Sequence, residues 1–213
     1  FRYSTEKLKR FKLVIDTANG MGGLVVSDFF KKIGCDITHL YPELDGTFPN
    51  HEANPLKEEN LLDLQETVRK ETADLGIAFD GDADRCIFVD EKGVTVSSDF
   101  IVALVAKAIL SKEKKQRILY DVRSSKVVGE IITENGGIPG RCNVGHSLVK
   151  AQMKKENARF AGELSGHYYL QDENYAEAPF FVILKLLESL TKGNTFSELV
   201  KPLKKYFQSG EIN

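Results

Sequence analysis

Short apolar runs recur along this chain, and each is followed by a polar or glycine-rich turn and then by apolar residues at helical spacing. The first run, Leu13-Val14-Ile15, precedes Gly20-Met21-Gly22-Gly23 and an apolar pattern that ends at Ile33. Short, fully apolar runs are typical of strands buried on both faces, which occur in parallel sheets covered by helices on both sides. The order strand, turn, helix therefore predicts an α/β fold.

The same order of elements occurs twice. Strands are predicted at 13–15, 37–41, 75–79 and 87–89, and again at 118–120, 142–144, 160–161 and 168–170. Each half also has a polar loop after its third strand, at 80–85 and 162–167. We predict two similar α/β domains, residues 1–97 and 98–213, each a mixed, mainly parallel sheet flanked by helices. Ser98 or Asp99 is a suitable N-cap for a helix that begins at Phe100.

Composition and charge exclude several classes of function. The 213 residues contain 29 Lys+Arg and 31 Asp+Glu, a net charge of -2, so no overall positive field attracts nucleic acid or an anionic membrane. The most apolar stretches, 101–110 and 180–190, each contain a lysine and are too short to cross a bilayer. Cys35, Cys86 and Cys142 are widely spaced, which suits a reducing compartment. We expect a cytoplasmic protein with neither a nucleic-acid nor a membrane partner.

Three aspartates alternate in Asp80-Gly81-Asp82-Ala83-Asp84-Arg85, directly after the predicted strand 75–79. Carboxylates that converge to within about 5 Å repel one another by roughly 3 kcal/mol per ionised pair at an effective dielectric of 20. A hard cation such as Mg²⁺ or Ca²⁺ would compensate, and Arg85 could add a fork for a phosphate. A solvated acidic turn is the plain alternative. An EF-hand ending at Glu91 is disfavoured, because Arg85 stands where glycine is expected and the flanks are strand-like.

The second polar loop, Gly162-Glu163-Leu164-Ser165-Gly166-His167, places an acid, a hydroxyl and an imidazole between glycines. A carboxylate accepts hydrogen bonds from neighbouring sugar hydroxyls, whereas serine and histidine can donate or accept. A simple hairpin turn is equally compatible with this composition. A serine-hydrolase elbow is disfavoured, because no Gly-x-Ser-x-Gly surrounds Ser165.

Three further segments lie at predicted strand ends, where open α/β sheets place ligand groups. Asp121-Val122-Arg123 and Val144-Gly145-His146-Ser147 follow strands of the second half. Arg123 is otherwise a surface cation, and Ser147 a cap for a helix from Leu148 with His146 its exposed neighbour. Gly20-Met21-Gly22-Gly23 lacks the full spacing of a dinucleotide fingerprint and is interpreted as structural.

The two hexapeptides together resemble the metal loop and the sugar-binding loop of the α-D-phosphohexomutases, the phosphomannomutase/phosphoglucomutase family. Their order and separation match, and the resemblance extends to Asp16-Thr17-Ala18-Asn19-Gly20 and to 144–147. It covers essentially the whole chain, which is similar to the second and third of that family's four domains.

The resemblance implies residue roles. It implies a Mg²⁺ site formed by Asp80, Asp82 and Asp84, with Arg85 beside the phosphate of a phosphoserine that also contacts the metal. It implies sugar-hydroxyl contacts from Glu163 and Ser165, with His167 close by, and a cleft lined by Arg123 and His146. The activity implied is transfer of the phosphoryl group from serine to a hexose phosphate, reorientation of the bisphosphorylated sugar, and return of its other phosphate.

Other parts of the family pattern do not occur in the 213 residues. No segment like Thr-Ala-Ser-His-Asn-Pro, which carries the phosphoserine, is present, and no phosphate-binding loop follows Glu211-Ile212-Asn213, which resembles the start of the fourth domain. We expect the chain to be inactive without the family's first and fourth domains. Leu164 favours mannose or glucose phosphate over glucosamine phosphate. A non-enzymatic cation- or carbohydrate-binding module, or a phosphatase with an aspartyl nucleophile, remain alternatives.

Overall fold

The computed structural model describes residues 8–207, which divide into two compact units. The first unit contains residues 8–97 and 179–197, and the second contains 98–178 and 198–207. The sequence predicted two continuous domains, 1–97 and 98–213, and these domain bounds stay a prediction. The structural units differ from them in that residues 179–197 group with the first unit. Glu211-Ile212-Asn213, assigned from the sequence to the start of a following domain, lie outside the described residues.

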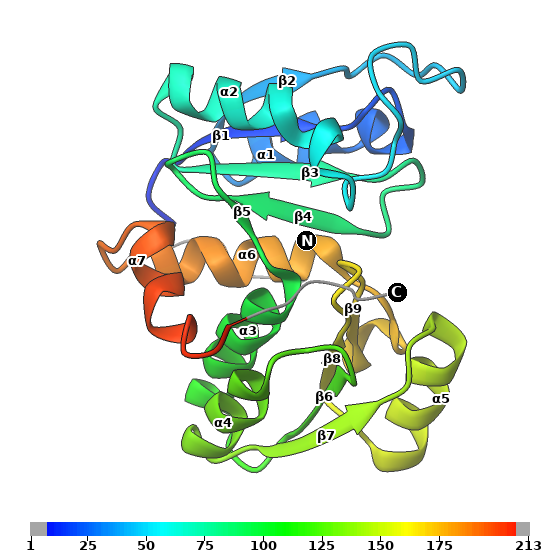
Figure 1. The fold of residues 1–213 in the computed structure, drawn as a ribbon, viewed down its shortest axis with the longest axis vertical. Coiled ribbons are helices and arrows are strands. Elements are labelled where there is room, and N and C mark those ends of the chain that lie inside the picture. The colour runs from blue at the N-terminus through cyan, green and yellow to red at the C-terminus, as the bar shows by residue number, and fades with distance from the viewer. Residues whose placement is uncertain (1–7, 208–213) are drawn as a thin grey trace. The chain divides into compact units, whose positions relative to one another are not determined.

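The first unit is a five-stranded sheet with the order β2-β1-β3-β4-β5 (Figure 1). β1 is parallel to β2 and β3, whereas the pairs β3–β4 and β4–β5 are antiparallel. The crossovers from β1 to β2 and from β2 to β3 run in opposite directions, so right-handed connections put α1 and α2 on opposite faces. The elements are β1 (Lys12–Asp16), η1 (Met21–Leu24), α1 (Val26–Lys32), β2 (Asp36–Leu40), η2 (Glu58–Leu61), α2 (Leu62–Glu71), β3 (Leu75–Phe79), β4 (Cys86–Val89), β5 (Thr95–Val96) and α6 (Pro179–Leu190).

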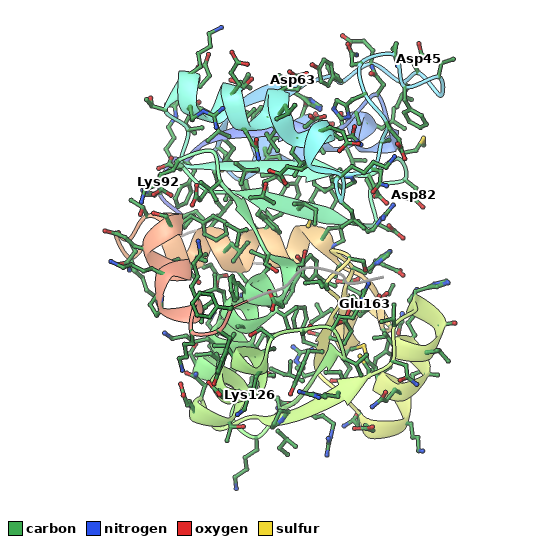
Figure 2. The ribbon with its side chains drawn as sticks, viewed as in Figure 1. Asp45, Asp63, Asp82, Lys92, Lys126 and Glu163 are labelled. Carbon is green, nitrogen blue, oxygen red and sulfur yellow. The ribbon has the colours of Figure 1, made fainter. Side chains whose placement is uncertain are left out.

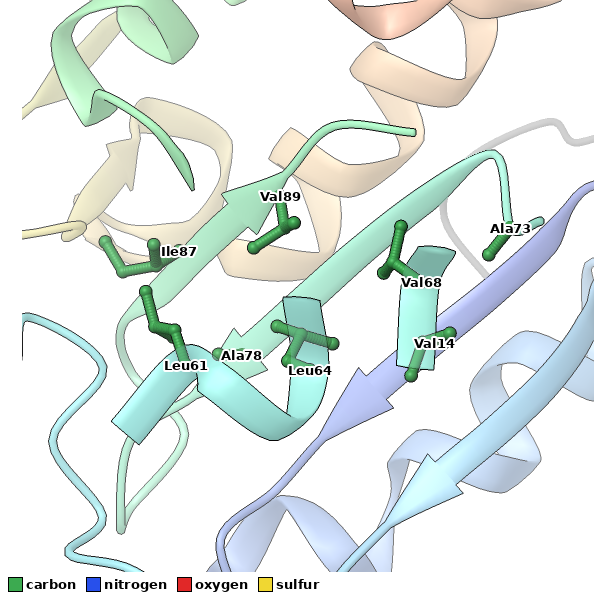
Figure 3. Packing of buried hydrophobic residues seen from close by; sticks show 8 residues of the cluster. All are labelled: Val14, Leu61, Leu64, Val68, Ala73, Ala78, Ile87 and Val89. Atoms are coloured by element: carbon green, nitrogen blue, oxygen red, sulfur yellow. The ribbon is translucent and has the colours of Figure 1, made fainter. Parts of the chain in front are cut away.

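Alternation along the strands divides the core of this unit between the two faces of the sheet. On one face, residues of β1, β3 and β4 pack against α2, as Figure 3 shows for Val14, Leu64 and Val89. On the other face, the Phe180 ring of α6 lies 4.5 Å from Phe29 of α1 and 5.8 Å from Phe79 of β3, measured between ring centroids. Helix α6 therefore covers the sheet of the first unit, although it follows the second unit's sheet in sequence.

The second unit repeats this plan with the order β10-β9-β8-β6-β7. β6 is parallel to β7 and β8, and β8–β9 and β9–β10 are antiparallel, so β6 corresponds to β1 and β8 to β3. The predicted fold class, two similar α/β units with mixed, mainly parallel sheets, is confirmed. The elements are α3 (Ser98–Lys112), β6 (Arg117–Asp121), α4 (Lys126–Glu134), β7 (Ile138–Cys142), α5 (His146–Glu156), β8 (Phe160–Gly162), β9 (Tyr168–Leu170), η3 (Gln171–Glu173), β10 (Ala176–Glu177) and η4 (Lys201–Leu203). Helix α7 (Phe196–Val200) begins in the first unit and ends in the second.

Three boundaries in the second unit differ from the prediction. β7 ends at Cys142, where the predicted strand 142–144 begins, and it contains Pro139. Proline is tolerated because β7 is an edge strand that pairs only with β6. α5 begins at His146, two residues before the predicted start at Leu148, and α3 begins at Ser98 and not at Phe100.

Across residues 8–207, none of the helices combines the length and apolarity needed to cross a membrane.

Candidate functional site

The acidic loop connects β3 to β4 at the carboxyl end of β3. Asp80 is buried and Asp84 is half-buried. Asp82, which is labelled in Figure 2, is exposed. One oxygen from each carboxylate can be chosen so that all three lie within 4.8 Å of one another. The loop turns through Ala83, which has a left-handed φ of 63°, and not through Gly81. The predicted convergence of the three aspartates is therefore present.

The donor set fits a hard divalent cation. Two oxygens on opposite sides of a bound ion lie about 4 Å apart for Mg²⁺ and about 5 Å apart for Ca²⁺, so the present spacing is already in the range that such ions need. Arg85 belongs to the same cluster, because its Nε donates to Asp80 Oδ2 at 2.5 Å and its backbone N–H donates to Asp80 Oδ1 at 3.1 Å. The guanidinium is thereby held beside the acidic loop.

A second turn supports the acidic loop from the neighbouring strand. β1 and β3 are parallel neighbours, so the turns that follow them meet at one edge of the sheet. The backbone N–H of Met21 donates to the Gly81 carbonyl at 2.8 Å. A Cβ added to Gly20 would lie 2.7 Å from the same carbonyl oxygen, so only glycine fits there. The glycine turn interpreted as structural from the sequence thus supports the acidic loop directly.

The segment between β2 and η2 lies against the same edge. Asp16, the last residue of β1, accepts hydrogen bonds from the Ala18 N–H at 2.8 Å and from His51 Nε2 at 3.0 Å. This side-chain bond to Asp16 is the main cause that raises the pKa of His51 above its ordinary value of 6.5. By contrast, burial is the main cause that lowers the pKa of His39.

We predict opposite pH trends for His51→Gln and His39→Gln. The raised pKa of His51 means that its charged form stabilises the fold fully below pH 6.5, and that this contribution is lost as pH rises through the raised pKa. The lowered pKa of His39 means that its neutral form contributes above pH 6.5 and that this contribution is lost as pH falls. Urea unfolding from about pH 5 to 9 measures the difference in the free energy of unfolding between each variant and the wild type. If this difference grew with rising pH for His51→Gln, the stabilising role of charged His51 would be contradicted.

The second polar loop occupies the corresponding place in the second unit, between β8 and β9. Glu163 is 1% exposed, whereas Ser165 and His167 are half-buried and Ser165 Oγ lies 3.0 Å from His167 Nδ1. Glu163 Oε1 accepts from the Gly145 N–H at 2.9 Å, and Oε2 accepts from the Tyr169 hydroxyl at 2.6 Å. The carboxylate predicted to bind sugar hydroxyls is thus buried and bonded inside the unit.

Asp121 joins Arg123 to this loop. It is fully buried at the end of β6, and its Oδ2 accepts from Arg123 Nη2 at 2.8 Å and from the Leu164 N–H at 2.9 Å. Arg123 and His146 are both exposed, and His146 is the first residue of α5 directly after Gly145. In the second unit, four predicted site residues therefore accompany two buried carboxylates, Asp121 and Glu163, the second of which is itself a predicted site residue; the four are Arg123, His146, Ser165 and His167.

The sequence analysis did not single out Tyr169, and it placed Asp121 and Gly20 at strand ends without predicting that Asp121 accepts hydrogen bonds or that Gly20 lies against the acidic loop. Their contributions depend on contacts between segments that follow different strands. The parallel pairing of β6 with β7 and β8 was the available clue, since it brings three strand ends together. Burial raises the pKa of Cys142 to about 12 and that of Cys86 well above its ordinary value, which favours the protonated thiol at both positions.

The chain is similar to known proteins over most of its length. Residues 1–93 match phosphoglucomutase/phosphomannomutase, alpha/beta/alpha domain II, and residues 97–206 match domain III of the same family. A phosphomannomutase from Methanocaldococcus jannaschii is 38% identical over 203 residues, which are 95% of this chain and 45% of the relative. A phosphoglucomutase/phosphomannomutase family protein from Burkholderia thailandensis superposes with a TM-score of 0.89 at 34% identity, over 95% of this chain and 46% of that one.

A more distant structure shares the fold. N-acetylphosphoglucosamine mutase from Aspergillus fumigatus, solved in complex with GlcNAc-6P and magnesium, has a TM-score of 0.65 at 17% identity over 91% of this chain and 46% of that one. This chain thus spans about half the length of the relatives that it matches. It belongs to the phosphoglucomutase/phosphomannomutase family, of which it carries the α/β/α domains II and III.

Proposed function

We propose that this chain is the metal- and sugar-binding part of a phosphohexomutase that interconverts the 6-phosphate and 1-phosphate of mannose or glucose. The observation that carries the proposal is the cluster of three carboxylates within 4.8 Å, in a chain that matches domains II and III of this family. The phosphoserine and the remaining phosphate contacts would come from outside these 213 residues. The chain alone is then expected to bind ligands without turning them over.

In this proposal Asp80, Asp82 and Asp84 hold Mg²⁺. Their oxygen donors suit that ion, and the fungal N-acetylphosphoglucosamine mutase of the same fold was solved with magnesium. A metal bound there would neutralise charge on the phosphoryl oxygens. Arg85, held by Asp80, would direct its guanidinium toward the same phosphate.

The second unit would bind the sugar phosphate. The exposed Arg123 guanidinium, oriented by Asp121, is suited to a phosphate, and His146 would line the site beside it. Ser165 and His167 would contact sugar hydroxyls, together with Glu163 if a hydroxyl replaces one of its present donors. In the transfer itself, a sugar oxygen forms a bond to phosphorus while the serine oxygen–phosphorus bond breaks, and the hydroxyl proton leaves to a base or solvent.

The test is a ³¹P NMR assay of the intact protein with glucose 1-phosphate or mannose 1-phosphate, Mg²⁺ and a trace of glucose 1,6-bisphosphate. We expect conversion to the 6-phosphate, and no conversion by the 213-residue chain. Arg123→Gln is expected to lower kcat/KM by about tenfold or more, because it removes a charge-assisted hydrogen-bond donor. Arg141→Gln, which removes an exposed arginine of the same unit, is the matched control.

The other outcomes separate the alternatives. Release of inorganic phosphate by the isolated chain would indicate a phosphatase with an aspartyl nucleophile. Sugar-phosphate binding by the intact protein without isomerisation would indicate a non-enzymatic binding module. Either result would overturn the mutase proposal.

A further inference from the structure

Glu163 is a buried carboxylate whose two oxygens are bonded to different elements of the second unit. Oε1 accepts from the backbone of Gly145, in the turn before α5, and Oε2 accepts from the hydroxyl of Tyr169 in β9. With 1% of its surface exposed, it depends on such donors more than a surface carboxylate does. Its position is therefore decided by Gly145 and Tyr169.

Tyr169 is held rigidly where it can serve as a donor. It lies in β9 between Ala161 of β8 and Glu177 of β10, is fully buried, and packs in the core against α5. Its ring is stacked on that of His167, with 6.2 Å between centroids and an interplanar angle of 16°. A tyrosine side chain has only two torsions to order, so its hydroxyl gives a well-defined hydrogen bond.

The charged groups around Tyr169 and Glu163 already have partners of their own. Lys150 of α5 lies over the Tyr169 ring, 5.7 Å from its centroid, and its Nζ is 2.7 Å from Glu177 Oε1. Asp121 of β6 accepts from Arg123, and His167 Nδ1 is 3.6 Å from Glu163 Oε2. The neutral hydroxyl of Tyr169, at 2.6 Å, is thus closer to Glu163 Oε2 than the imidazole is.

Gly145 provides the second hydrogen-bond donor to Glu163. It is the N-cap of α5 with φ 120° and ψ 125°, a conformation that non-glycine residues rarely adopt, and no side chain caps the helix. Its N–H bond to Glu163 ties this turn to the loop 163–167. The exposed His146 follows directly, so the placement of its backbone depends on that bond.

From these contacts we infer that Tyr169 is a positioning residue. Its hydroxyl orients the Glu163 carboxylate, which in turn holds the Gly145 turn and thereby sets His146 relative to Ser165 and His167. The meaning of these residues for sugar-phosphate binding rests on the proposed function, whereas the positioning itself does not. The inference goes beyond the resemblance, since Tyr169 lies outside both hexapeptides.

Tyr169→Phe tests the inference, because it removes one oxygen and keeps the ring. In the 213-residue chain, amide hydrogen exchange of Gly145 measured by NMR is expected to accelerate by roughly tenfold, since Glu163 loses the donor that orients it. Tyr168→Phe is the matched control: it removes a neighbouring, equally buried hydroxyl from the next residue of the same strand, where alternation directs the side chain to the opposite face of the sheet. Unchanged Gly145 exchange in Tyr169→Phe, or equal acceleration in both variants, would overturn the inference.

A binding measurement separates positioning from a merely structural role. Glucose 6-phosphate is titrated into each chain and followed by amide chemical shifts. If wild type binds, Tyr169→Phe is expected to raise the Kd several-fold and Tyr168→Phe to leave it unchanged, and an unchanged Kd in Tyr169→Phe would overturn the positioning role. If wild type does not bind, the proposed function loses its support while Gly145 exchange still decides whether Tyr169 positions the turn.

Discussion

Asp82→Asn is expected to abolish measurable Mg²⁺ binding by this chain and the mutase turnover that we propose for the intact protein. Asp82 is the most exposed of the three clustered carboxylates and accepts none of the hydrogen bonds described above, so its charge is available to a cation. The affinity of an oxygen-ligand site depends strongly on its number of charged ligands, and this cluster has three. The measurement is a Mg²⁺ titration followed by the amide chemical shifts of Gly81 and Ala83, which lie between the aspartates.

Asp28→Asn is the matched control, because Asp28 is an exposed aspartate of α1 in the same unit and lies outside the cluster. It makes the same change in net charge, so a general electrostatic effect would appear in both variants. Only the loss of a ligand distinguishes them. Wild-type Mg²⁺ binding by Asp82→Asn would show that the acidic loop is a solvated turn and would remove the metal from the proposed function.

Gly162→Ala is expected to destabilise the second unit by about 2–3 kcal/mol, the upper range for an overpacked core. A Cβ at this position would lie 2.3 Å from Val102 Cγ2 and 3.2 Å from Tyr168 Cδ1. Gly162 ends β8, which is flanked by β6 and β9, and Val102 belongs to α3, most of whose residues are buried, so neither backbone can move away cheaply. Urea unfolding measures the difference in the free energy of unfolding.

A compensating substitution tests whether this contact is the cause. Val102→Ala removes the methyl group that an alanine at 162 would meet, so the double variant is expected to lose less stability than the sum of the two single variants. Gly46→Ala is the control for the glycine-to-alanine change, since a Cβ there meets nothing within 4 Å. Additive losses in the double variant would mean that Gly162 is needed for a reason other than the space beside Val102.

Much of the fold could be predicted from local sequence patterns. Runs such as Leu13-Val14-Ile15 and Leu75–Phe79 were predicted as buried strands, and both are strands of the first sheet. Their fully apolar character is sufficient evidence because strands covered on both faces have no polar side to alternate with. The position of β7 was the least accurate strand prediction. This edge strand contains Pro139 and Gly140, and only its last residue is buried, so its sequence has little apolar pattern.

The sequence by itself determined that two polar loops would each follow a buried strand in one of two similar α/β units, and the aspartates predicted to converge do so. Only the tertiary structure decided that Glu163 is buried and bonded to Gly145 and Tyr169, that Gly20 must leave room for the Gly81 carbonyl, and that residues 179–197 lie with the first unit. The physical reason is that hydrophobic periodicity reports the local environment of a segment. A buried polar group, however, is satisfied by donors from other strands and turns, and their identity depends on how the strands pair in space.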